Sequence, residues 1–73
     1  MTYRVKEIEH NKVLATGLVR YKTAQQHALD ACKTMEENVI VVNEDDDDIL
    51  CIALPNEGHP YLSLVTSGAK DNE

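Results

Sequence analysis

The sequence predicts a small two-layer α+β domain with the element order ββαββ(β), in which one helix backs a mostly antiparallel sheet. An alanine-rich segment with helical spacing lies mid-chain, between segments rich in β-branched residues. Turn-forming residues divide those outer segments into pairs, which is typical of hairpins. The 73 residues leave room for one domain, predicted over residues 1–66, with a flexible tail over residues 67–73.

The first two strands are predicted to form a hairpin. Apolar and basic residues alternate from Tyr3 to Lys6, which indicates a strand with one exposed face. A turn at residues 10–11 separates it from a second strand over residues 12–21, in which Gly17 predicts a bulge or kink.

The alanine-rich segment predicts a helix from about Ala24 to Glu37. Thr23, followed three residues later by Gln26, has the spacing of a capping box. The apolar residues at helical spacing form one stripe of mostly small side chains, so this helix can lie close to a sheet. The stripe consists of Ala24, Ala28, Ala31 or Cys32, and Met35, with Leu29 beside them.

Two continuous apolar runs, residues 39–42 and 49–54, predict a second hairpin around an acidic turn. Continuous apolar strands are typical of strands buried on both faces, whereas one helix covers only one face of a small sheet. We therefore expect the second face to be covered by the C-terminal segment or by a second chain, which favours a homodimer. Residues 61–65 are predicted to be either a short fifth strand or an arm.

Charge is divided unevenly along this chain, whose net charge is −6. Residues 1–33 hold six basic and three acidic residues, whereas residues 34–68 hold eight acidic residues and no Lys or Arg. Nucleic acid is not expected as a partner, because domains that bind it are usually basic.

The acidic turn between the two apolar runs holds the candidate site residues. Three interpretations stay open: a solvated tip that keeps the strands from aggregating, a contact surface for a basic partner, and a loose cation site. An EF-hand starting at Asp46 is excluded, because Leu50 and Cys51 stand where that loop needs an oxygen ligand and a glycine. The predicted partner-binding residues are Glu44, Asp45, Asp46, Asp47 and Asp48.

The sequence carries no catalytic or metal-binding pattern. His10, His27 and His59 form no pair at ligand spacing, so a metal site would have to be assembled by folding. Cys32 and Cys51 each lie in an apolar segment and are expected to be buried, reduced thiols, with a disulfide as the alternative. We therefore predict a non-enzyme with no catalytic residues, no cofactor and no metal.

Three functions fit these observations. The first is a small non-enzymatic interaction module or regulator that binds another protein. The second is an acidic inhibitor or nucleic-acid mimic, of phage or mobile-element type, that blocks a basic surface. The third is a ligand-binding or enzymatic subunit assembled on oligomerisation, with His59 or Cys51 at an interface. The sequence has no signal-peptide pattern and no apolar run of about 18 residues, so we expect a cytoplasmic protein without a membrane segment.

Overall fold

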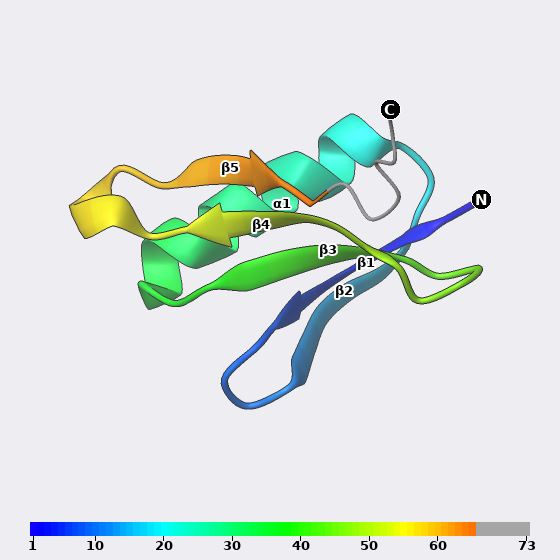
Figure 1. Cartoon of the computed structure of the whole chain (residues 1–73), viewed down its shortest axis with the longest axis horizontal. Coiled ribbons are helices and arrows are strands. Elements are labelled where there is room, and N and C mark those ends of the chain that lie inside the picture. The colour runs from blue at the N-terminus through cyan, green and yellow to red at the C-terminus, as the bar shows by residue number, and fades with distance from the viewer. Residues whose placement is uncertain (66–73) are drawn as a thin grey trace.

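Five strands and one long helix make up residues 1–65, the part of the chain that the computed structural model describes (Figure 1). The elements are β1 (Tyr3–Glu7), β2 (Lys12–Leu18), α1 (Tyr21–Met35), β3 (Val39–Asn43), β4 (Ile49–Leu54), a short 3₁₀ helix η1 (Asn56–Gly58) and β5 (Tyr61–Leu64). All neighbouring strands are antiparallel, in the spatial order β2-β1-β3-β4-β5. The predicted fold class and element order are therefore confirmed, whereas the predicted tail over residues 67–73 lies outside the described residues.

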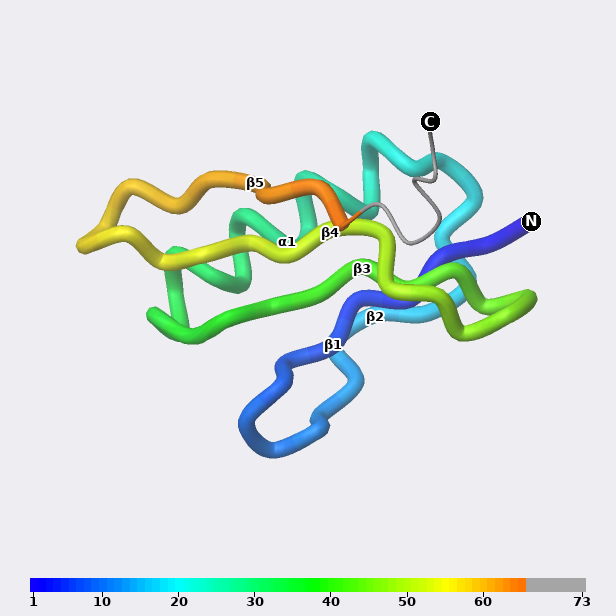
Figure 2. The backbone as a smooth tube through the Cα atoms, viewed as in Figure 1, coloured from blue at the N-terminus to red at the C-terminus, as the bar shows by residue number. Residues whose placement is uncertain are grey.

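Helix α1 connects two sets of strands that share one sheet. It carries the chain from β2 at the sheet edge to β3 at the centre, where β3 pairs with β1. Figure 2 shows the β1–β2 hairpin splayed away from β4 and β5, because the twist between neighbouring strands accumulates across a sheet. β5 pairs with the free edge of β4 and so widens the sheet rather than covering it. This decides between the fifth strand and the arm in favour of the strand.

The start of α1 differs from the prediction. The helix begins at Tyr21 with Arg20 as its N-cap residue, and no side chain caps it. The predicted capping box of Thr23 and Gln26 is wrong, because Thr23 already lies inside the first turn. The earlier start has a tertiary cause: Tyr21 packs against the core, and its ring centroid lies 5.4 Å from that of Tyr3.

The helix also ends earlier than predicted, at Met35 rather than Glu37. Glu36 adopts the left-handed conformation, with φ of 55°, and its N–H donates to the Cys32 carbonyl at 2.7 Å. A left-handed residue after the last helical turn ends a helix, so the chain turns away before Glu37.

The hydrophobic core lies between α1 and one face of the sheet. The predicted helix stripe is confirmed at its three fully buried members, all of which have small side chains. Small side chains let the helix lie close to the sheet, so the strand residues beneath them are also fully covered. The core cluster consists of Ala24, Ala28 and Cys32 from α1, and Val5, Val39, Val41, Cys51 and Ala53 from the sheet.

Both cysteines belong to this core and are free, as the sequence predicted. Burial raises the pKa of the Cys32 thiol. Burial also raises the pKa of the Cys51 thiol, although its hydrogen bond with Tyr21 opposes the shift. The two side chains therefore act as small apolar groups at neutral pH.

Candidate functional site

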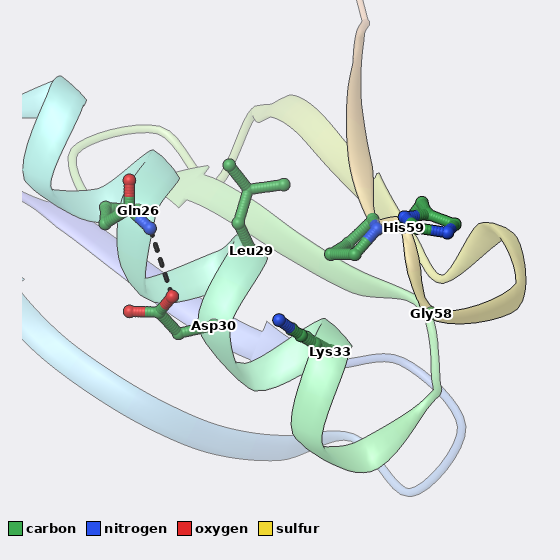
Figure 3. A pocket seen from close by; sticks show the side chains of 7 residues that line it. Gln26, Leu29, Asp30, Lys33, Gly58 and His59 are labelled. Atoms are coloured by element: carbon green, nitrogen blue, oxygen red, sulfur yellow. Dashed lines mark hydrogen bonds between the residues drawn. The ribbon is translucent and has the colours of Figure 1, made fainter.

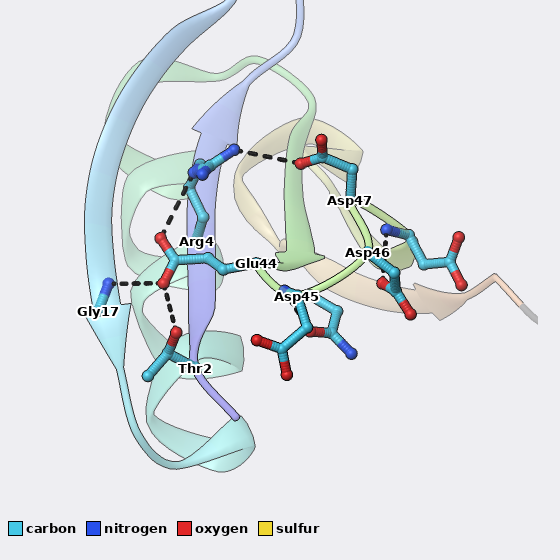
Figure 4. Close-up of polar contacts among 9 residues, drawn as sticks. Thr2, Arg4, Gly17, Glu44, Asp45, Asp46 and Asp47 are labelled. Carbon is cyan, nitrogen blue, oxygen red and sulfur yellow. Dashed lines mark hydrogen bonds and ion pairs between the residues drawn. The ribbon is translucent and has the colours of Figure 1, made fainter.

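Glu44, the first predicted partner-binding residue, folds back onto the sheet (Figure 4). Its Oε1 accepts hydrogen bonds from the Thr2 hydroxyl at 2.6 Å and from the Gly17 N–H at 3.2 Å. Its Oε2 lies 3.5 Å from Arg4 Nε. The Thr2 bond, followed by the Gly17 and Arg4 contacts, outweighs the effect of burial and lowers the pKa of Glu44. Glu44 therefore joins β3 to the β1–β2 hairpin and is not a free carboxylate.

Gly17, where the sequence predicts a bulge or kink, lies in a bulge of β2. It has a φ of 68° and lies opposite a register shift between β1 and β2. The left-handed conformation favours glycine there, and it brings the backbone N–H within reach of Glu44. The bulge thus contributes directly to the attachment of the acidic turn.

The four aspartates of the turn are exposed, but they differ in their contacts. Asp47 Oδ1 lies 3.4 Å from Arg4 Nη1. Asp46 Oδ1 accepts a hydrogen bond from the Asp48 N–H at 3.0 Å, which holds the turn locally. Within residues 1–65, Asp45, Asp46 and Asp48 form no ion pair. We call these three residues the acidic tip.

Replacement of Glu44 with alanine is expected to lower the midpoint of thermal unfolding by roughly 5 °C, because it removes three internal contacts. The matched variant Asp45→Ala should change the midpoint by less than about 1 °C, because that side chain is exposed. Thermal unfolding followed by circular dichroism measures both effects. Equal effects of the two substitutions would contradict a structural role for Glu44.

The effect of Glu44→Ala should also depend on pH. The pKa of Glu44 is lowered by folding from its ordinary value of 4.5, so its contribution is present above that pH. The contribution is lost as the pH falls through the folded-state pKa. The difference in midpoint between wild type and Glu44→Ala should therefore narrow as the pH is lowered below about 4.5.

The sheet face opposite α1 is apolar along its middle. Ile40, Val42, Ile52 and their strand neighbours alternate with the core residues, so they point away from the helix. Ile40 and Val42 are only 6% and 4% exposed because neighbouring side chains surround them. Towards β4 and β5 the exposure is larger, 40% at Ile49 and 49% at Tyr61. We call this surface the apolar face; it consists of Ile40, Val42, Ile49, Ile52, Leu54 and Tyr61.

An open pocket of about 420 Å³ lies between α1 and the η1–β5 loop (Figure 3). Charged and polar side chains from α1 line it, and Gln26 donates to Asp30 at 3.0 Å. His59 lines this pocket, whereas Cys51 is fully buried in the core and does not. Of the two residues that the sequence offers as alternatives for an interface, only His59 therefore lies at this pocket. Its lining residues are Gln26, Leu29, Asp30, Lys33, Gly58, His59 and Pro60.

A separate cluster combines Glu7, His10 and Glu37, which no sequence pattern groups together. One ligand atom from each side chain lies within 4.8 Å of the others. Glu7 ends β1, His10 lies in the β1–β2 turn, and Glu37 follows α1. The strand alternation continued beyond Val5 places Glu7 on the core side, so an inward-pointing carboxylate was detectable in the sequence. Its two partners, His10 and Glu37, were not detectable in the sequence, because their position beside Glu7 depends on tertiary structure.

Glu7 and Glu37 hold their protons with different strength. Both Glu7 oxygens accept from the His10 N–H at 3.0 Å, and His10 Nδ1 lies 3.3 Å from Glu7 Oε1. Burial alone raises the pKa of Glu7, but hydrogen bonds from Glu37 and His10 outweigh it, so the pKa is lowered. The hydrogen bond shared with Glu7, followed by burial, raises the pKa of Glu37. Glu37 is therefore the member that retains a proton more readily.

No protein-family model, curated protein or solved structure matches this chain. Among residues 1–65, no helix has the length and apolar character needed to cross a bilayer. The fold places the chain in the class of small α+β domains with one sheet and one covering helix. Within that class, its distinguishing features are the apolar face, the acidic tip and the Glu7–His10–Glu37 cluster.

Proposed function

We propose that this chain is a small protein-interaction module that binds another protein through the apolar face and the adjacent acidic tip. The observation that carries the proposal is the row of apolar side chains on the face without a helix. Each Å² of apolar surface removed from water contributes about 25 cal/mol, so a partner that covers this face gains binding energy. On this face Ile49 and Tyr61 are exposed, and Ile52 and Leu54 are half-buried. Exposed apolar side chains gathered on one face of a small domain are typical of interaction sites.

The acidic tip indicates the chemistry of the partner. It lies at the end of the apolar face where β3 leads into β4, and its three carboxylates have no cation partner among residues 1–65. Arg4, on the same face, is already engaged by Glu44 and Asp47. The fitting partner therefore presents an apolar centre beside Lys or Arg side chains, whose charge also speeds association.

A distinct protein fits this surface better than a second copy of the chain. Each copy has a net charge of −6, so two acidic tips brought close together would repel each other. The predicted homodimer is therefore one competing outcome of the binding experiment. An acidic inhibitor that uses charge alone is the other competing outcome.

Three variants separate the contributions to binding. Ile49→Ser with Tyr61→Ser removes exposed apolar groups from the apolar face. Replacement of all three residues of the acidic tip with Asn removes charge and keeps the Asp46 side-chain oxygen that accepts from the Asp48 N–H. Val19→Ser is the matched control, because Val19 is 74% exposed and lies outside the face.

The tagged full chain and its variants serve as baits in extracts of the source cells, with quantitative mass spectrometry. We expect one protein to be retained by wild type and Val19→Ser and lost with both other variants. With that protein purified, calorimetry should show Kd weakened at least about tenfold for each of those two variants. Higher salt should weaken wild-type binding more than binding of the Asn variant.

Two results would overturn the proposal in favour of its competitors. Loss of binding in the Asn variant alone would establish an inhibitor that acts through charge. Dimerisation in sedimentation velocity that Ile49→Ser with Tyr61→Ser abolishes would assign the apolar face to a second copy. The proposal would also be refuted if no retained protein needed both the apolar face and the acidic tip for its binding.

A further inference from the structure

We propose that Glu7, His10 and Glu37 form a binding site for one zinc-type divalent metal ion. This inference is independent of the proposed interaction with a protein. Antiparallel pairing of β1 and β3 places Glu7 beside Val39, at the start of β3, whereas the acidic tip follows the end of β3. The two sites therefore lie at opposite ends of one strand and can be altered separately.

The distances between the three ligand atoms fit a metal site after a small inward movement of one side chain. Zinc–ligand bonds of about 2.1 Å in a tetrahedral arrangement place neighbouring ligand atoms about 3.4 Å apart. His10 Nδ1 lies 3.3 Å from Glu7 Oε1 and 4.0 Å from Glu37 Oε1. All three ligand atoms lie within 4.8 Å of one another, so a movement of roughly 1 Å by the Glu37 side chain completes the set.

One carboxylate oxygen of the cluster, Glu37 Oε1, is buried, although the Glu37 side chain as a whole is 29% exposed. Apart from the hydrogen bond that Glu37 shares with Glu7, no donor among residues 1–65 reaches this oxygen. Glu7 beside it is fully buried, and within the same residues neither carboxylate pairs with Lys or Arg. An unpaired buried oxygen is costly, and two carboxylates in contact repel each other. A proton relieves part of this cost, whereas a divalent cation satisfies both carboxylates together.

The end of α1 adds to the preference for a cation. Glu37 comes directly after the C-cap residue Glu36, where the helix macrodipole is negative. This potential disfavours the two carboxylates and favours a positive ion bound between them. The His10 side chain is 69% exposed, so the site opens to solvent on that side and an ion can enter there with a water as fourth ligand.

The donor atoms indicate the class of metal. One imidazole nitrogen and two carboxylate oxygens suit zinc, and the two negative charges balance one Zn²⁺. Calcium takes six to eight oxygen ligands and magnesium retains an octahedral water shell, so a three-residue set with a nitrogen does not suit them. Zinc is therefore the probe for the experiment.

The test uses the full chain without a tag, titrated with zinc chloride in a calorimeter. We expect one zinc per chain, and a thermal midpoint raised by at least about 10 °C at a free zinc concentration of about 100 times Kd. Glu37→Gln and His10→Ala should each weaken zinc binding at least about tenfold. Glu37→Gln keeps a side-chain donor for Glu7, so its fold should persist and loss of binding reports loss of a ligand.

His27→Ala and His59→Ala are matched controls and should bind zinc as tightly as wild type. Cobalt in place of zinc should show the visible absorption of a four-coordinate ion without the near-ultraviolet band of thiolate ligation. A thiolate band would place the metal on Cys32 or Cys51 and overturn the proposal. Absence of binding by the folded wild type, or binding that both Glu37→Gln and His10→Ala leave unchanged, would overturn it as well.

Discussion

Both thiols of the native protein are expected to react at least about a thousandfold more slowly with a thiol-specific reagent than they do in the urea-unfolded chain. Cys32 and Cys51 are fully buried in the core, and burial raises the pKa of each thiol. Reaction therefore requires opening of the structure and formation of the thiolate. A 73-residue domain has an unfolding free energy of about 4 to 11 kcal/mol, and about 4 kcal/mol suffices for a thousandfold protection.

The measurement is the rate of labelling with excess reagent at pH 8, in the presence of a chelator. The single variants Cys32→Ala and Cys51→Ala assign each rate to one thiol. His27→Cys in the Cys32→Ala, Cys51→Ala background supplies an exposed thiol on the same helix, and it should react nearly as fast as the unfolded chain. A native Cys32 or Cys51 that reacts as fast as this control would contradict the closed core.

Replacement of Ala28 with leucine is expected to destabilise the protein by about 2–3 kcal/mol. Ala28 is fully buried between Ala24 and Cys32 on the helix stripe that faces the sheet. A leucine there adds three carbon atoms at a position with no exposed surface. The helix must then move away from the sheet, or the strand residues beneath it must shift. The urea midpoint should fall with little change in the slope of the transition.

His27→Leu is the matched control for this substitution, because the neighbouring residue His27 is exposed on the same helix. The added side chain points into solvent, and leucine has the higher helix propensity, so stability should change by less than about 0.5 kcal/mol. Similar losses in both variants would show that the helix stripe is not packed closely on the sheet.

The acidic turn shows how much of the candidate site could be predicted. Its position between two apolar strands follows from the sequence, because four aspartates interrupt two runs of apolar residues. The different roles of Glu44 and the aspartates do not follow. Glu44 is fixed by Thr2, which is 42 residues away, and by Gly17, which is 27 residues away. Contacts at such separations depend on strand pairing, which local patterns do not specify.

The metal-site candidate illustrates the same limit more strongly. His10 and Glu37 stand apart in the sequence and match no ligand motif. They meet because β1 pairs with β3 and because α1 ends at Met35, two residues before the predicted end. That end depends on the left-handed conformation of Glu36, which the residue type alone does not favour.

The sequence by itself determined the order of the elements, a helix stripe of Ala24, Ala28 and either Ala31 or Cys32, and a bulge or kink at Gly17. These features depend on periodicity and on backbone preferences within a few residues, which local sequence encodes. Only the tertiary structure decided which sheet face stays without a helix, which acidic residues are already paired, and that two glutamates and a histidine meet. These features depend on the register between distant strands and on the packing of the whole core.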